Sequence, residues 1–224
     1  MAIYSVALVV GGFFTTDNET LLFYKNNAKG SVANGTNKDM EFIKDKKFYI
    51  NTVLLFFYLG FEYSVNGWFI TYLKDTGIMS VSLATTLVSI TWIAILISRL
   101  FIAKISQKIS SKKIMVFDSL GLLTGFIMLI STKNVFIIVI SLFILGLFMA
   151  PVFPLSYAVS KESLHGSAFA MTIFTALTAI GGIITPYILG VISNTFNMST
   201  AVFMLIVNSI LIFILSCINY KFEK

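Results

Sequence analysis

The sequence is poor in charged residues, and this shortage excludes a soluble globular protein. Charged side chains make up 12% of its 224 residues and hydrophobic side chains 57%. A soluble globular domain carries about 25% charged residues, so a chain of this composition has too few charged side chains to cover its surface in water. The net charge of +6 comes from basic residues scattered between apolar runs, which is typical of membrane orientation and not of nucleic-acid binding.

Cysteine and histidine are almost absent. Cys217 is the one cysteine and His165 the one histidine, which excludes an internal disulfide framework and a metal site built from these residue types. The sequence also has no phosphate-binding glycine loop with a lysine. We therefore expect no cofactor, no metal and no enzymatic activity.

Six long apolar runs make up most of the chain. A membrane-spanning helix needs about 20 apolar residues, whereas a membrane barrel would show alternating segments of about 10 residues. The runs are long and continuous, so they predict an all-α membrane protein with a six-transmembrane-helix bundle at residues 48–219. We place the spans at residues 48–73, 80–102, 114–130, 135–158, 167–193 and 200–218.

Two segments precede the bundle and a short tail follows it. Residues 1–14 are apolar but too short to cross the membrane at about 1.5 Å per residue. We interpret them as the tail of a transmembrane helix whose beginning is missing. Residues 15–47 are polar and include six lysines, which predicts a flexible linker. Residues 220–224 form the tail.

Lysine and arginine are distributed unevenly between the two ends of the predicted spans. Fourteen of them lie on the side of the linker and the C-terminus, and only Lys74 and Lys133 lie on the other side. Basic loops remain in the cytoplasm. We therefore expect a multi-pass protein of the cell (plasma or inner) membrane, with the linker and the C-terminus cytoplasmic.

The basic loop after the second span resembles a loop of the major facilitator superfamily of transporters. Residues 103–113 have the spacing of that family's Gly-x-x-x-Asp-Arg-x-Gly-x-Arg-Arg loop, although Gln107 replaces its acid. In the family such a loop supports conformational change at the cytoplasmic face. The four basic residues of the loop are Lys104, Lys108, Lys112 and Lys113.

Three spans resemble the fucose permease-like branch of sugar:proton symporters in that superfamily. Residues 60–72 are similar to the Gly-x-Glu…Trp…Tyr pattern of the seventh helix of this branch. Residues 146–154, with their Ala-Pro-x-x-Pro element, resemble its tenth helix, and residues 181–190 resemble its eleventh. The resemblance implies the second half of the major facilitator fold, with two inverted three-helix repeats and residues 1–14 as the tail of a sixth helix.

The resemblance also implies a secondary transporter that moves a sugar or a similar small polar solute by proton-coupled alternating access. One six-helix half supplies one side of the transport cavity, so we expect a separately encoded N-terminal half or a second copy as partner. Other interpretations stay open. They are a truncated half-transporter without independent activity, a drug or metabolite exporter of the same superfamily, and a membrane enzyme or channel subunit.

Glu62 is the principal candidate for function, because it lies in the middle of the first span. An ionisable group at that depth is costly and usually faces a cavity or a partner. Tyr58, Asn66 and Phe69 share its helix face, and tryptophan rings could contact a sugar ring. Alternatively, Glu62 locks two helices together and the tryptophans anchor their helices. The resulting candidates are Tyr58, Glu62, Asn66, Trp68 and Trp92 for substrate binding and Glu62 for proton coupling.

Other unusual residues within the spans have structural interpretations. We expect the three prolines to interrupt their helices, either as gating bends or as static kinks; they are Pro151, Pro154 and Pro186. We expect Gly181 and Gly182 to permit close helix packing. Asp118 lies near the basic loop, and we expect it to form an ion pair with Arg99 or Lys104.

Overall fold

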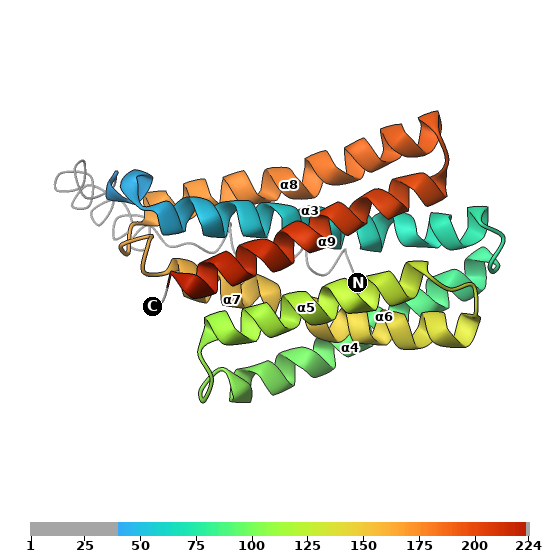
Figure 1. The fold of residues 1–224 in the computed structure, drawn as a ribbon, viewed down its shortest axis with the longest axis horizontal. Helices are drawn as coiled ribbons and strands as arrows, with labels where there is room; N and C mark the ends of the chain where they lie inside the picture. Colours follow the sequence, from blue (N-terminus) through green and yellow to red (C-terminus); the bar gives the residue numbers. More distant parts are fainter. Residues whose placement is uncertain (1–39, 223–224) are drawn as a thin grey trace, which may run out of the picture. The chain divides into compact units, whose positions relative to one another are not determined.

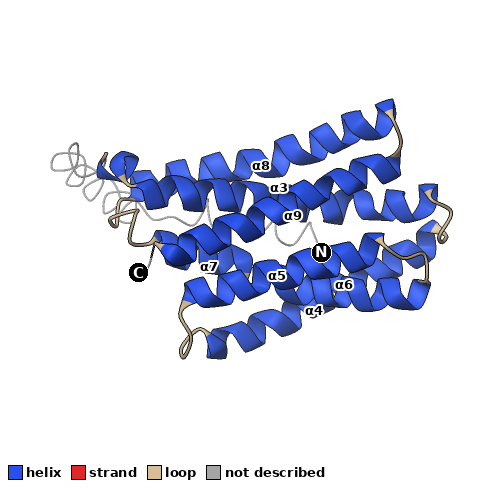
Figure 2. Cartoon of the chain, in the orientation of Figure 1, coloured by secondary structure: helices blue, strands red, loops and turns tan. Residues whose placement is uncertain are grey.

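The computed structural model describes residues 40–222, and that part of the chain is helical throughout, without strands (Figure 2). The predicted partial helix at 1–14 and nearly all of the linker lie outside the described residues. The helices belong to one compact unit that begins at Phe42. They are η1 (Glu41–Lys44), α3 (Lys46–Asp75), α4 (Val81–Ile105), α5 (Ser111–Ile130), α6 (Val135–Met149), α7 (Val152–Ser160), α8 (Ala168–Thr195) and α9 (Met198–Lys221).

These helices supply the six predicted membrane spans. Within the described residues, six helical segments are long and apolar enough to cross a membrane, and α6 with α7 counts as one of them. The prediction of an all-α bundle with six spans is therefore confirmed. Successive spans alternate in direction, so ten described Lys and Arg residues lie at one end and only Lys74 and Lys133 at the other. We call these the basic end and the opposite end.

Polar side chains set the first residue of several helices. Asp45 accepts a hydrogen bond from the Lys47 amide at 2.8 Å, and Asn197 accepts one from the Thr200 amide at 2.8 Å. Such caps satisfy N–H groups that have no partner within the first helical turn. For this reason α3 begins at Lys46 and α9 at Met198, each two residues before the start predicted from hydrophobicity alone.

The bundle consists of two groups of three helices (Figure 1). In one group α3 packs on α8 and α9, and in the other α6 packs on α4 and α5. The first helix of each sequence half therefore packs with the second and third helices of the other half. Helices α5 and α9 connect the two groups. This exchange is the arrangement expected of two inverted three-helix repeats.

Two prolines divide the fourth span into α6 and α7. Pro151 and Pro154 have no N–H to donate, and lie three residues apart, so two helical hydrogen bonds are lost within one turn. The helix is interrupted at residues 150–151, as predicted. At Pro186 the helix is not interrupted, because α8 continues through it from Ala168 to Thr195, and a bend at this position stays a prediction. A single proline removes one bond from a helix of 28 residues, and the bonds on either side hold it together.

Hydroxyl groups from two neighbouring helices bind the carbonyl groups at the α6–α7 break. The carbonyl of Leu147 would normally accept from residue 151, which is Pro151 and has no N–H. It accepts instead from the Ser98 hydroxyl of α4 at 2.6 Å. Tyr58 of α3 donates to the carbonyl of Met149 at 2.7 Å. Helices α3 and α4 thus hold the break in place.

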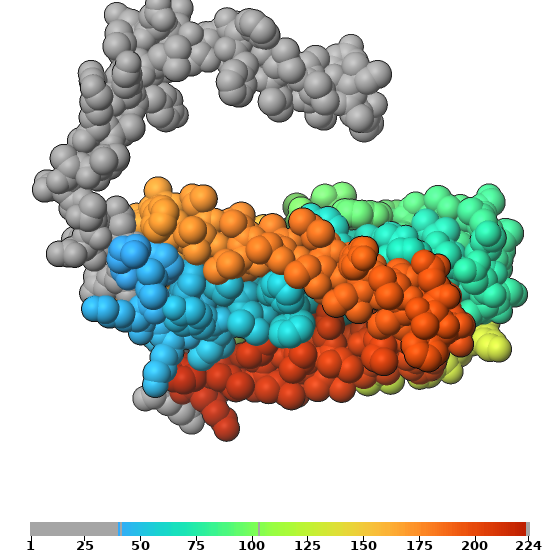
Figure 3. All heavy atoms as spheres, turned by 90° about the horizontal axis from the view of Figure 1, so that it is seen from above, coloured from blue at the N-terminus to red at the C-terminus, as the bar shows by residue number. Residues whose placement is uncertain are grey.

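Glycines bring α3 and α8 into backbone contact near the middle of the spans, on the face shown in Figure 3. A Cβ on Gly181 would overlap the backbone carbonyl of Phe56, and a Cβ on Gly60 would overlap the side chain of Thr185. This confirms that Gly181 serves close packing. Since α8 lies directly against α3, the side chains beside this crossing are brought together on one surface.

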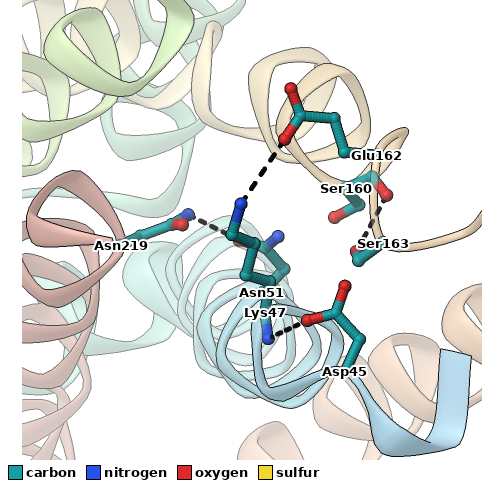
Figure 4. Close-up of polar contacts among 7 residues, drawn as sticks. All are labelled: Asp45, Lys47, Asn51, Ser160, Glu162, Ser163 and Asn219. Carbon is teal, nitrogen blue, oxygen red and sulfur yellow. Dashed lines mark hydrogen bonds and ion pairs between the residues drawn. The ribbon is translucent and has the colours of Figure 1, made fainter. Parts of the chain in front are cut away.

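At the basic end, polar contacts tie the start of α3 to two other segments (Figure 4). The Asn219 amide of α9 donates to the side-chain oxygen of Asn51 in a buried contact. Lys47 forms an ion pair at 3.6 Å with Glu162 in the loop after α7. These contacts join the basic end of α3, the helix that carries Glu62, to α9 and to the loop after α7.

Candidate functional site

A groove containing several hydroxyl groups lies between α3, α7 and α8. Its volume is about 460 Å³. Polar lining comes from Tyr63 of α3, Tyr157 of α7, and Thr175 and Thr178 of α8, and Phe153 of α7 supplies an apolar ring. We call it the hydroxyl groove. It combines hydrogen-bonding groups with a flat apolar surface, which is the chemistry that a sugar requires.

Tyr157 and Thr175 form a hydrogen-bonded pair in this groove. Their hydroxyl oxygens are 3.1 Å apart. Thr175 directs its own hydrogen to the carbonyl of Met171 at 2.9 Å, so Tyr157 is the donor to Thr175. The Tyr157 oxygen keeps its lone pairs for another donor. The Phe153 ring lies 5.0 Å from the Tyr157 ring, centroid to centroid, so the apolar surface adjoins the polar pair.

A second groove lies on the other side of α7 and is lined by one positively charged side chain, that of Arg99. It has a volume of about 660 Å³ and is lined by Arg99 of α4, Ser106, Ser111, and Phe153 and Pro154 of α7. Phe153 lines both grooves. Arg99 is exposed, and the one ion pair found among residues 40–222 is that of Lys47 and Glu162. The guanidinium group of Arg99 thus has no ion pair within residues 40–222.

Glu62 of α3 lines neither of these grooves. Its side chain is half-buried, next to the Tyr58 hydroxyl and within electrostatic reach of Arg99. No ion pair joins Glu62 and Arg99 at 4.0 Å or less in the described structure. Asn66, one turn further along α3, is half-buried, and its side-chain oxygen has no hydrogen-bond partner. The Asn66 oxygen is thus a buried acceptor without a donor.

The structure separates the other predicted binding residues. Tyr58 is only 1% exposed and its hydroxyl is used at the α6–α7 break. The Trp68 ring packs beside Gly190 of α8, and Trp92 is 55% exposed on α4. The predicted set is thus not a single cluster.

Sequence reasoning missed the residues that define the hydroxyl groove. Tyr157 and Thr175 are separated by 18 positions in the sequence, and only the packing of α7 on α3 and α8 joins them. A weak signal was present, because Thr172, Thr175 and Thr178 recur at every third position of an apolar helix. That period places them on neighbouring parts of one helix face.

The acid near the basic loop does not have the predicted partner. Asp118 is 4% exposed, and its Oδ2 atom has no hydrogen-bond partner. The expected ion pair with Arg99 or Lys104 is absent from the described structure, so that prediction was wrong. Asp118 points between α4, α5 and α6, where apolar side chains surround it, and Arg99 lines a different groove. Among residues 40–222, no three acidic, histidine or cysteine side chains form a cluster that could hold a metal ion.

Comparison with known proteins identifies one family. A family model described as Major Facilitator Superfamily matches residues 52–221. "Bypass of stop codon protein 6" of Saccharomyces cerevisiae is 26% identical over 169 residues, which are 69% of this chain and 34% of that protein.

Two solved structures share the fold. A major facilitator superfamily transporter, FucP, in the outward conformation has a TM-score of 0.68 at 17% identity, over 79% of this chain and 43% of that chain. A second structure, of the E. coli fucose:proton symporter FucP, has a TM-score of 0.66 at 18% identity, with the same coverage. The chain thus spans less than half the length of each of these three proteins.

Proposed function

Because the chain belongs to the major facilitator superfamily, a family of membrane transporters and not of enzymes, we propose that it forms one side of the solute site of a secondary carrier. The solute is a sugar or a similar small polar molecule. The carrier moves it by alternating access, in which two six-helix bundles rock around a site near the middle of the membrane. Residues 48–219 supply one of these bundles.

The hydroxyl groove is the observation that supports a sugar. The Tyr157–Thr175 pair and Tyr63 offer donors and acceptors for hydroxyl groups, and Phe153 offers a surface for the C–H face of a ring. A groove of this kind binds a solute with few charges and many hydroxyls. The similarity in fold to the fucose:proton symporter FucP agrees with this class of solute.

Glu62 is our candidate for proton coupling. A carboxyl group at the middle of a span, half-buried and without an ion pair, can exchange a proton when the cavity opens to water. Arg99 lies within electrostatic reach of Glu62. A solute or a movement that changes their separation would therefore change the electrostatic environment of the carboxyl group. From the distribution of lysine and arginine, we place the basic end on the cytoplasmic side of a cell membrane.

Transport in vesicles tests the solute class. The chain is expressed in membranes, and uptake of a labelled hexose or deoxyhexose is measured, together with binding to the purified protein. Tyr157→Phe and Thr175→Val should each weaken binding by about five- to tenfold, the equivalent of one hydrogen bond to a sugar hydroxyl. Tyr187→Phe and Thr172→Val are the matched controls on α8, because both residues are exposed and neither lines the groove.

The outcomes separate the possibilities. Equal losses in Tyr157→Phe and in the Tyr187→Phe control would remove the groove from the mechanism. Saturable uptake of a carboxylate-bearing solute that depends on Arg99 and not on Tyr157 would replace the sugar by an anion. Sugar binding without uptake would show that the second six-helix bundle is required for movement.

Proton coupling is tested separately at Glu62. Glu62→Gln should abolish the uptake driven by an imposed pH gradient but leave exchange of labelled for unlabelled sugar, because exchange needs no net proton movement. Asn66→Asp serves as a control for charge at the neighbouring position. Gradient-driven uptake that is unchanged in Glu62→Gln would exclude Glu62 as the coupling group.

A further inference from the structure

An apolar groove with a buried carboxyl group lies on a different side of the bundle, between α4, α5 and α6. Its volume is about 580 Å³. Large apolar side chains form its sides, and two of them, Phe101 and Phe117, are each 63% exposed. Its main apolar lining consists of Phe101, Ile105, Ile114, Phe117, Phe143 and Leu147. No residue of the hydroxyl groove takes part.

The groove extends over one leaflet of the membrane. Ile97 and Ile105 of α4 both line it, and eight residues of α-helix rise about 12 Å. Half of the hydrocarbon core measures about 15 Å. The groove begins at Ile109 and Lys113 at the basic end and ends at Phe143 and Pro151, next to the α6–α7 break. Its length therefore suits an acyl chain of the leaflet at the basic end.

Asp118 gives this groove a polar position. Its side chain lines the groove and is only 4% exposed, and its Oδ2 atom has no hydrogen-bond partner. A buried polar group without a partner is costly, so a ligand group that binds to it would be favoured. Asp118 lies five residues after Lys113, which corresponds to about 7.5 Å along α5.

That distance agrees with the depth of a lipid's glycerol region. The polar region of a bilayer is about 5–7 Å thick on each side of the core. If a phosphate group binds at Lys113, the glycerol and ester groups lie at the level of Asp118 and the acyl chain lies deeper. Simple hydrocarbon contact would not require a polar group at this level.

The mouth of the groove is strongly basic. Lys113 lines it directly and is exposed. The positive end of the α5 dipole lies at the same place. Basic clusters next to a membrane span attract anionic lipid headgroups. The lysines of the loop from α4 to the first turn of α5 are Lys104, Lys108, Lys112 and Lys113.

We propose that this groove binds an anionic phospholipid from the leaflet at the basic end. The phosphate binds Lys113, the protonated Asp118 carboxyl donates a hydrogen bond to an ester carbonyl of the glycerol region, and one acyl chain fills the apolar groove beside α4, α5 and α6. A bound lipid in this position would reach from the basic loop to the α6–α7 break. Lipid composition would thereby affect the helices that hold the break.

Native mass spectrometry of the purified chain tests the proposal without a transport assay. The protein is mixed with equal amounts of dioleoyl phosphatidylglycerol and dioleoyl phosphatidylcholine, and the lipids retained in the gas phase are counted. Lys113→Gln should lower retention of the anionic lipid about fivefold, which corresponds to one lysine at a membrane surface. Lys221→Gln, at the same end on α9, is the matched control and should retain lipid like the wild type.

Two further pairs of variants examine the interior of the groove. Ile105→Trp should fill the groove and lower retention of both lipids, whereas Ile214→Trp, at a similarly exposed position of α9, should not. Asp118→Leu should lower retention of phosphatidylglycerol, and Asp118→Asn, which can still form a hydrogen bond, should preserve most of it. Wild-type helix content of Asp118→Leu by circular dichroism shows that a loss of lipid retention in that variant is not due to misfolding.

Three results would overturn the proposal. Equal losses in Lys113→Gln and Lys221→Gln would show general attraction of anionic lipid to the basic end. Equal retention of the two lipids by the wild type would contradict recognition of a negative headgroup. An adduct with the mass of a second chain that Ile105→Trp abolishes would show that the groove is an interface between copies and not a lipid site.

Discussion

The replacement of Ser98 by alanine gives the sharpest test of how the broken fourth span is held. Ser98 is 7% exposed, and its hydroxyl donates to the Leu147 carbonyl at 2.6 Å. That carbonyl has no donor in its own helix, because the residue four positions later is Pro151. In Ser98→Ala it loses its partner in a buried part of the bundle.

The expected loss of stability follows because the Leu147 carbonyl has no other hydrogen-bond donor. A buried carbonyl left unsatisfied costs about 1–3 kcal/mol, although measured hydrogen bonds between membrane helices average about 0.6 kcal/mol and reach about 1.7 kcal/mol. We expect Ser98→Ala to lower the free energy of unfolding by about 1.5 kcal/mol, near the upper measured limit. Ser216→Ala is the control. Ser216 is fully buried and donates to the carbonyl of Ile212 within α9, which also has an N–H partner in the helix, so its loss should be about 0.5 kcal/mol or less.

The free energy of unfolding can be measured by titration with sodium dodecyl sulfate in mixed micelles. Cys217 is half-buried in α9 and is the one cysteine of the chain. Its reaction with a fluorogenic maleimide therefore reports unfolding without an engineered label. A second probe, far-ultraviolet circular dichroism, checks that the transition is the same for helix content.

A double-mutant cycle decides whether Pro151 causes the effect. Pro151→Ala supplies the N–H that the Leu147 carbonyl lacks, so the cost of Ser98→Ala in that background should fall to the level of the Ser216→Ala control. The reasoning is refuted if Ser98→Ala and Ser216→Ala cost the same, or if Pro151→Ala leaves the cost of Ser98→Ala unchanged.

Two further predictions concern packing and surface charge. Gly181→Val should destabilise the protein by about 3 kcal/mol or more, because the added side chain would overlap the Phe56 carbonyl. Gly67→Ala should stabilise α3 by up to about 1 kcal/mol, because nothing lies within 4 Å of the added Cβ. The same detergent titration compares the two variants. Glu162→Gln should change stability by less than about 0.5 kcal/mol, since its ion pair with Lys47 is largely exposed; a loss above 1.5 kcal/mol would mean that this contact holds α3 in place.

The sequence predicted the fold well because membrane spans depend on the summed hydrophobicity of long segments. Individual polar contacts could not be predicted in the same way. The start of α3 at Lys46 depends on the cap at Asp45, and the continuity of α8 depends on Pro186 being alone in its turn. Both are decided by one or two backbone hydrogen bonds, to which a hydrophobicity pattern is insensitive.

The candidate site was predicted in part, for a reason of geometry. Helical periodicity places Glu62 and Asn66 one turn apart on α3, and both are half-buried. It does not say which neighbouring group a side chain meets. Tyr58 binds the Met149 carbonyl, which is 91 positions away, and Tyr157 meets Thr175 only because α7 follows a proline break. These partners depend on helix packing, which one sequence does not specify.

The hydroxyl groove and the apolar groove between α4, α5 and α6 should differ in their contact with water. This difference tests the proposed solute site and the proposed lipid site together. A thiol reacts with a water-soluble methanethiosulfonate only as the thiolate, which forms in water and not in lipid. In a Cys217→Ala background, Ala179→Cys, at an exposed position in the hydroxyl groove, should react rapidly and be protected by a bound sugar. Phe117→Cys should react slowly in membranes although Phe117 is 63% exposed, because a lipid chain covers it. Rapid reaction at Phe117→Cys would place the α4–α5–α6 groove in contact with water and exclude a lipid there, and an inert Ala179→Cys would exclude a solute path along α8.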